Sequence, residues 1–161
     1  MASRIEFSKA APGALRAMLC LEKYLHECEL EPSLLDLVRM RASQMNGCAY
    51  CLDMHSKDAR AAGETEQRLY LLDAWRESPF YSDRECAALA WTEALTQIGD
   101  NHVPDAVYRQ AREHFTEKEL VDLSLAIVAI NGWNRLSIGF RSTVGGYQPG
   151  MLAGMTKKAH E

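Results

Sequence analysis

The stretch from Pro32 to Gly63 reads PSLLDLVRMRASQMNGCAYCLDMHSKDARAAG and contains two helix-length segments separated by Asn46-Gly47. Proline suits the first turn of a helix, so the first segment is expected to begin at Pro32. Its apolar residues recur at helical spacing, and Gly47 suits its end because glycine readily adopts the conformation that closes a helix. The second segment is expected to begin at the cysteines and to stop at Gly63. Such a short connection predicts an antiparallel helical hairpin.

The rest of the chain also shows helical periodicity. Helices are expected from residue 12 to about 29, over 69–75, from 82 to about 98, over 104–115 and from 116 to about 141, with a turn at 100–103. Ser82 with Glu85 and Thr116 with Glu119 have the spacing of capping boxes, in which a hydroxyl and a carboxylate satisfy free backbone N–H groups. No alternating apolar and polar run is long enough for a strand. The sequence therefore predicts an all-α fold.

Length and composition suit one globular domain. The 161 residues are 47% apolar and 25% charged, with a formal net charge of −4 and no basic stripe, so neither nucleic acid nor a membrane is an expected partner. No apolar leader or membrane-length run is seen, which favours a cytoplasmic protein. We expect a single domain over 1–161, with a core at about 12–141 and an irregular tail at 142–161.

Cysteines and histidine concentrate just after Gly47. Cys48, Cys51 and His55 occupy positions i, i+3 and i+7, which share one face of a helix. This arrangement suits thiol redox chemistry, in which one thiolate attacks, a second thiol forms the disulfide and an imidazole moves the proton. The other cysteines, Cys20, Cys28 and Cys86, have no such spacing and are interpreted as buried thiols, as expected in a reducing compartment.

The predicted hairpin favours reactivity of this pair. In the first turn of a helix, free N–H groups and the helix dipole favour a thiolate, which should lower the pKa values of Cys48 and Cys51. Asp36 and His55 lie roughly 16 Å and roughly 12 Å along their helices from Gly47, so the carboxylate could orient the imidazole.

Each of these residues also has a plainer interpretation. The cysteine pair could be coincidental, or Cys48, Cys51 and His55 could bind zinc if a fourth ligand came from elsewhere. Asp36 lies three residues after Ser33 and could belong to a helix cap. The indoles of Trp91 and Trp133 fit a core or a subunit interface better than a substrate site. The remaining histidines, which have no partner pattern, are interpreted as structural or surface residues: His26, His102, His114 and His160.

The segment 36–55 resembles the signature of the AhpD-like alkylhydroperoxidases, within the carboxymuconolactone decarboxylase superfamily. The segments Trp75–Phe80, Glu85–Glu93 and Ile130–Arg135 are also similar to family segments, so the resemblance covers most of the chain from about 12 to 141. The family normally has a glutamate twelve residues before the first cysteine, where this sequence has Asp36. The shorter side chain favours a bridging water over direct contact with the imidazole.

The resemblance implies an all-α protein that forms homo-oligomers, often trimers or hexamers, and reduces hydroperoxides. By position, Cys51 would be the peroxidatic thiolate, Cys48 the resolving thiol and His55, with Asp36, the proton relay. The reductant would be an external dithiol, in related proteins a dihydrolipoyl group. No flavin or nicotinamide fingerprint is present, so no bound cofactor or metal is expected.

Two other functions are compatible with this resemblance. Carboxymuconolactone decarboxylases in the same superfamily remove carbon dioxide from a lactone acid, but they lack the redox pair. A non-enzymatic thiol sensor or disulfide partner, whose oxidation alters assembly, would keep the pair and lack peroxide turnover.

Overall fold

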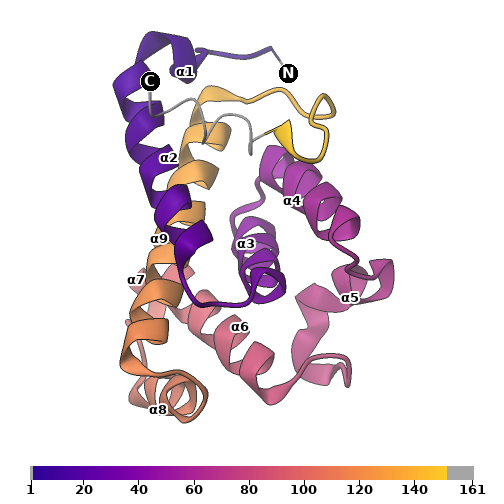
Figure 1. Ribbon diagram of the computed structural model, residues 1–161, viewed down its shortest axis with the longest axis vertical. Helices are drawn as coiled ribbons and strands as arrows, with labels where there is room; N and C mark the ends of the chain where they lie inside the picture. The colour runs from indigo at the N-terminus through magenta and orange to yellow at the C-terminus, as the bar shows by residue number, and fades with distance from the viewer. Residues whose placement is uncertain (1, 152–161) are drawn as a thin grey trace.

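The computed structural model describes residues 2–151 and consists of helices joined by short connections (Figure 1). In chain order these are α1 (Phe7–Ala10), α2 (Pro12–Glu27), α3 (Pro32–Asn46), α4 (Ala49–Ala61), α5 (Glu66–Leu71), the 3₁₀ helix η1 (Leu72–Glu77), α6 (Asp83–Thr96), α7 (Ile98–Asn101), α8 (Asp105–His114) and α9 (Glu117–Phe140). No strand occurs within these residues, which confirms the all-α prediction. Residues 152–161 of the predicted tail, His160 among them, lie outside the described part.

The helix boundaries follow from local sequence signals. Pro12 and Pro32 stand in the first turns of α2 and α3, and both predicted capping boxes are formed, at the starts of α6 and α9. Gly47 ends α3 with a φ of 66°, in the left-handed region where glycine is favoured. The antiparallel hairpin of α3 and α4 is therefore present, with the cysteine pair at the start of α4 (Figure 1).

Two expectations need correction, and one short helix was not predicted. The segment predicted as one helix over 69–75 is divided between α5, which ends at Leu71, and η1, within which Ala74 has non-helical dihedral angles. The turn predicted at 100–103 is partly occupied by α7. Helix α1 was not predicted, because four residues are too few for periodicity; Phe7 holds it in place by packing against the rings of Trp133 and Phe140.

Helix α3 lies at the centre of the packing. It contacts α4 on one side, α9 and α6 on others, while α2 packs along α9. The largest apolar cluster joins α2, α3, α6, α8 and α9 and includes the fully buried Leu25, Val38, Leu123 and Ile127. A separate, smaller cluster of Ala42, Cys48, Cys51 and Ile130 lies where α3, α4 and α9 meet. The core thus fixes the cysteine pair against two other helices.

After α9 the chain turns back to α4 (Figure 1). The Gly145 N–H donates to Asp53 Oδ2 at 3.2 Å, and Lys57 Nζ donates to the Tyr147 carbonyl at 3.1 Å. The Tyr147 hydroxyl donates to the Asp58 carboxylate at 2.8 Å, and its ring is buried. The described part of the predicted tail, residues 142–151, is therefore irregular in backbone but bound to the helix that carries the cysteines.

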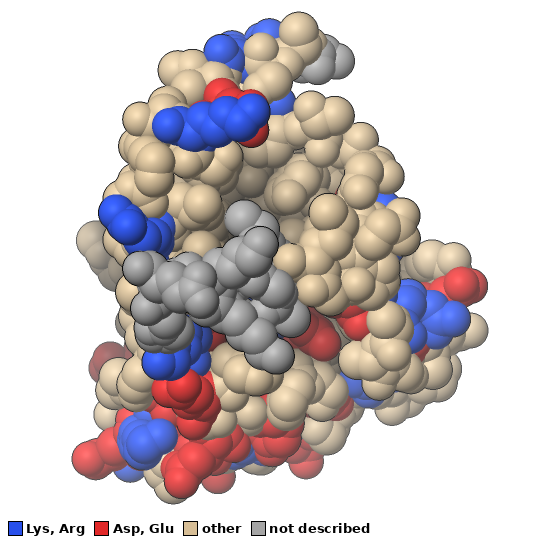
Figure 2. Space-filling view, turned by 45° about the horizontal axis from the view of Figure 1, so that its top comes forward, with Lys and Arg blue, Asp and Glu red and all other residues tan. Residues whose placement is uncertain are grey.

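Charge is unevenly distributed on the face shown in Figure 2, where acidic side chains gather toward the lower end and the upper part is largely uncharged and hollowed. Lys and Arg side chains on that face lie in separate groups. Within residues 2–151, no helix is both long enough and apolar enough to cross a membrane.

Candidate active site at the start of α4

The turn between α3 and α4 positions the first cysteine. The Gly47 N–H donates to the Gln44 carbonyl at 3.1 Å, and the Cys48 N–H donates to the Ser43 carbonyl at 3.0 Å. Cys48 is the N-cap residue of α4, and its Sγ accepts a hydrogen bond from the Cys51 N–H at 3.4 Å. The sulfur of Cys48 thus occupies the place of a capping oxygen, where free N–H groups favour negative charge.

Cys48 and Cys51 form a disulfide, with their Cα atoms 5.4 Å apart. Each cysteine is only 1% exposed, and the pair packs against Ala42 and Ile130, with Tyr50 and Trp133 at the edge of the cluster. The predicted redox pair is therefore close enough for reversible disulfide formation. Its burial means that a reductant reaches the sulfur atoms only through a local movement.

The other cysteines are free thiols. Cys28 and Cys86 are partly buried, but Cys20 is exposed, so the prediction that all three are buried was wrong. Cys20 lies at an exposed position of α2. The apolar residues near it in the sequence follow the helical pattern, but Cys20 itself does not face the core.

His55 lies one turn beyond Cys51 on α4 and is 8% exposed. Its Nε2 is the one buried side-chain nitrogen or oxygen within residues 2–151 that lacks a hydrogen-bond partner. Burial, and secondarily the positive charge of Arg39, lower the pKa of His55 from 6.5 to about 3. The ring is thus neutral near pH 7, with a free nitrogen that can accept or donate a proton.

Asp36 does not hydrogen-bond to His55 among the described contacts. Its Oδ1 instead pairs with Arg39 Nη1 at 3.5 Å, a distance at the limit of a hydrogen bond. Burial raises the pKa of Asp36, and the Arg39 charge opposes that rise. The alternative in which Asp36 belongs to a cap with Ser33 is wrong, since α3 begins at Pro32 after Glu31 without a side-chain cap.

Asp36 also borders a cavity of about 450 Å³. The lining residues come from the start of α3, the end of α4, the turn after it and α5. They are Pro32, Ser33, Asp36, Ala59, Ala62, Gly63, Glu64 and Arg68. The carboxyl group therefore has space beside it into which a water molecule fits, but His55 is not among the residues that line this cavity.

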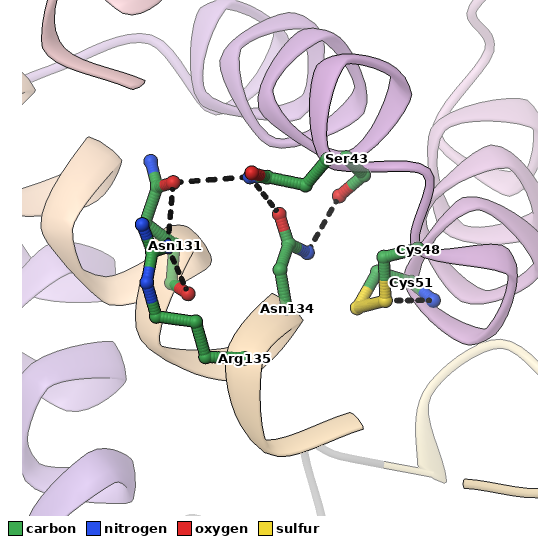
Figure 3. The surroundings of a disulfide bond; sticks show 7 residues. Ser43, Cys48, Cys51, Asn131, Asn134 and Arg135 are labelled. Carbon is green, nitrogen blue, oxygen red and sulfur yellow. Dashed lines mark hydrogen bonds between the residues drawn. A yellow bond between two sulfur atoms is a disulfide. The ribbon is translucent and has the colours of Figure 1, made fainter. Parts of the chain in front are cut away.

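A polar cluster between α3 and α9, not predicted from the sequence, supports the turn before Cys48 (Figure 3). Asn46 Nδ2 donates to Asn131 Oδ1 at 3.0 Å and to Asn134 Oδ1 at 2.8 Å. Asn134 Nδ2 donates to Ser43 Oγ at 3.1 Å. Three-residue spacing places Asn131 and Asn134 on one face of α9, which was the available signal in the sequence.

A chain of charged and aromatic side chains was also missed. Arg39 Nη2 pairs with Glu22 Oε2 at 3.0 Å, and the Trp133 Nε1–H donates to Glu22 Oε1 at 2.9 Å.

No group of three or more His, Cys, Asp or Glu side chains within residues 2–151 is arranged to bind a metal ion.

Comparison with known proteins gives this site a family context. Residues 12–94 match the family model described as the carboxymuconolactone decarboxylase family. The uncharacterized protein YdfG of Bacillus subtilis is 47% identical over 138 residues, which is 86% of this chain and 94% of that protein. The uncharacterized protein YnjA of Escherichia coli is 34% identical over 116 residues, 71% of this chain and 60% of that protein.

Solved structures agree with this assignment. A protein of unknown function from Agrobacterium tumefaciens, provisionally described as the antioxidant defence protein AhpD, is 42% identical with a TM-score of 0.87, over 91% of this chain and all of that one. The debrominase Bmp8 is 19% identical with a TM-score of 0.77, over 95% of this chain and 80% of that one, and shares the fold. With its all-helical AhpD-like fold and its cysteine pair at the start of α4, the chain belongs to the carboxymuconolactone decarboxylase family.

Proposed function

We propose that this protein is a thiol-dependent peroxidase that reduces hydroperoxides through a dithiol–disulfide cycle of Cys48 and Cys51. One observation carries the proposal: a cysteine pair that forms a disulfide at a helix N-terminus lies one turn from a buried histidine with an unpartnered nitrogen. A buried polar atom without a hydrogen-bond partner costs free energy in a folded protein. The unpartnered Nε2 of His55, one turn from the disulfide, therefore favours a role for this nitrogen when the sulfur atoms are reduced to thiols.

The first half of the cycle uses the reduced protein. Neutral His55 takes the proton of the Cys51 thiol, and the thiolate attacks one oxygen of the hydroperoxide. The O–O bond breaks, Cys51 becomes a sulfenic acid and the leaving alkoxide takes the proton from His55 to form an alcohol. Asp36, through a bridging water, steadies the imidazole while it carries the proton.

The second half restores the thiols. The Cys48 sulfur attacks the sulfenic acid, water leaves and the disulfide of this structure forms. An external dithiol, such as a dihydrolipoyl group, then opens the disulfide by thiol exchange and leaves as its own disulfide. No bound cofactor or metal is needed for this cycle.

The exposed apolar side chains Val121 and Val128 of α9 support the further proposal that the protein works as a homo-oligomer.

Turnover of an organic hydroperoxide with a dithiol reductant tests the proposal. Wild type should consume cumene hydroperoxide with dihydrolipoamide, and Cys51→Ser and Cys48→Ser should each lose turnover. Cys20→Ser removes an exposed free thiol and serves as the matched control that keeps wild-type turnover. Absence of wild-type turnover with each of several dithiols contradicts the proposal, and activity that survives in Cys51→Ser but not in Cys48→Ser reverses the two roles.

Asp36→Asn tests the acid in the relay. The amide keeps the size of the side chain but cannot exchange a proton, so kcat should fall about tenfold while the protein stays folded. Glu66→Gln, which removes an exposed carboxylate from α5, is the control and should leave kcat unchanged. An unchanged kcat in Asp36→Asn removes Asp36 from the mechanism.

A further inference from the structure

The hydrogen bonds of the asparagine cluster run in a fixed direction. Asn131 Nδ2 donates to the Ile127 carbonyl at 2.9 Å and to Thr96 Oγ1 at 3.0 Å, and a carbonyl can only accept. The amide oxygen of Asn131 therefore faces Asn46, which has to present its NH₂ group. Asn46 Nδ2 donates to Asn131 Oδ1 at 3.0 Å and to Asn134 Oδ1 at 2.8 Å. Turning any of these amides around would place two donors or two acceptors against each other.

This direction decides which group of Asn134 reaches the turn before Cys48. Because its oxygen accepts from Asn46, its NH₂ group is left for α3, and Nδ2 donates to Ser43 Oγ at 3.1 Å (Figure 3). Ser43 in turn accepts the Cys48 N–H through its main-chain carbonyl at 3.0 Å. Ser43, Cys48 and Asn134 are 0%, 1% and 1% exposed. A series of buried contacts thus leads from α9 to the main-chain nitrogen of the first cysteine.

The position of that main chain affects how readily Cys48 reacts with Cys51. The Cys48 sulfur accepts the Cys51 N–H at 3.4 Å, and the two Cα atoms are 5.4 Å apart. Two quantities set the rate at which one thiol closes a disulfide with its neighbour: how often the sulfur atoms meet, and what fraction of the attacking thiol is thiolate. A main chain held at Cys48 raises the first, and the helix N-terminus beside its sulfur raises the second. Loss of the hold lowers both, so the two effects slow closure together.

We propose that Asn134 and Ser43 are positioning residues for the step in which Cys48 closes the disulfide. This inference rests on the proposed peroxidase cycle for its place in catalysis, where Cys48 attacks the Cys51 sulfenic acid and water leaves. While closure is pending, a second hydroperoxide can transfer an oxygen atom to the sulfenic acid, leave as an alcohol and convert the sulfur to an inactive sulfinic acid. By speeding closure, the contacts from α9 protect Cys51 from this overoxidation.

Closure can be measured without a hydroperoxide, by oxidising the reduced protein with glutathione disulfide. One cysteine of the pair forms a mixed disulfide and releases one glutathione, and the other then displaces the second glutathione as the Cys48–Cys51 disulfide forms. Trypsin cuts after Arg41 and Lys57, so the peptide 42–57 contains both of these cysteines and no other. After acid quenching and alkylation, its mass distinguishes the dithiol, the mixed disulfide and the disulfide. The decay of the mixed disulfide gives the closing rate.

Ser43→Ala and Asn134→Ala should each close about tenfold more slowly than wild type. The double variant should be no slower than the slower single variant, because both changes remove the same hydrogen bond. A role in folding stability alone would leave the closing rate unchanged in protein that stays folded, and the helical circular dichroism signal identifies that protein.

Ser124→Ala is the matched control. Ser124 also makes a side-chain hydrogen bond between α9 and another helix, since its Oγ accepts the Trp91 Nε1–H at 2.9 Å, but this contact does not lead to Cys48. Its loss should leave the closing rate unchanged.

Wild-type closing rates in both Ser43→Ala and Asn134→Ala overturn the proposal. A loss of about a hundredfold in the double variant, the product of two independent effects, also overturns it. Since glutathione disulfide takes the place of the hydroperoxide, an inactive wild type in the peroxidase assay removes the proposed function but does not affect this measurement.

Discussion

Asn134 Nδ2 donates a hydrogen bond to Ser43 Oγ at 3.1 Å, and the carbonyl of the same serine accepts the N–H of Cys48 at 3.0 Å. Figure 3 shows the first of these hydrogen bonds, between Asn134 and Ser43. One residue of α3 therefore connects α9 to the backbone of the first redox cysteine. Ser43 and Asn134 are 0% and 1% exposed, so water does not replace either contact. The position of Cys48 thus depends on the side chain of Asn134, which lies 86 residues further along the sequence.

Asn134→Ala should lower the free energy of unfolding by about 2 kcal/mol. The change removes the donor to Ser43 and the acceptor for Asn46, and it leaves buried polar groups with fewer partners. Denaturant unfolding of the oxidised protein measures the loss. Gln110→Ala, on the exposed face of α8, is the control and should stay within about 0.5 kcal/mol of wild type. Equal stability of the two variants would show that the asparagine cluster does not support the turn.

Gly47→Ala tests the turn itself. Gly47 has a φ of 66° and open space where a Cβ would stand, so the cost is purely conformational, about 1 kcal/mol of unfolding free energy. Gly13→Ala is the matched change, since it also meets no neighbouring atom but lies at a negative φ in α2, where alanine is favoured. Gly13→Ala should be neutral or stabilising. A loss of the same size at both positions would contradict the conformational explanation.

Local signals made much of the fold predictable. Pro12, Pro32, Gly47 and the capping serine and threonine act within one turn of themselves, so their effect can be derived without knowledge of the tertiary structure. Neither the change from α5 to η1 after Leu71 nor the kink at Ala74 was predictable in this way, because no glycine or proline marks either place. Packing of the buried Leu72 and Trp75 against the rest of the fold competes there with helical propensity.

Only part of the site was predictable, because contacts within one helix leave a spacing pattern in the sequence and contacts between distant helices do not. Helical spacing alone placed Cys48, Cys51 and His55 together, and the structure agrees. Glu22 and Trp133 lie 111 residues apart in the sequence, and their hydrogen bond leaves no periodic signal. Nor does a sequence reveal which partner an acid chooses when several are near: Asp36 pairs with Arg39, one turn along its own helix.

Tyr147→Phe should loosen the segment 142–151 from α4. The hydroxyl donates at 2.8 Å to both carboxylate oxygens of Asp58, and the ring is 6% exposed, so one charge-assisted hydrogen bond is lost from a buried place. Backbone amides of this segment should exchange with deuterium about tenfold faster, which corresponds to roughly 1.4 kcal/mol of local opening free energy.

Tyr70→Phe is the control for that change. Tyr70 also donates to a carboxylate, that of Glu66, but at 3.3 Å and with 75% of the residue exposed, so exchange in the tail should not change. Unaltered exchange of residues 143–150 in Tyr147→Phe would show that Gly145 and Lys57 are enough to hold the segment.

The pH dependence of stability should reveal the buried neutral state of His55. Its pKa is about 3 in the folded protein and about 6.5 in the unfolded chain, so between these values the unfolded state binds one more proton. Stability due to this group is therefore complete above about pH 6.5 and is lost as the pH falls, by about 1.4 kcal/mol per pH unit. His55→Leu should remove that part of the slope, whereas His26→Gln, at an exposed position on α2, should retain it. Denaturant unfolding of the oxidised proteins between about pH 4 and 7 measures the difference, and a His55→Leu curve parallel to that of wild type would show that the imidazole is protonated inside the fold.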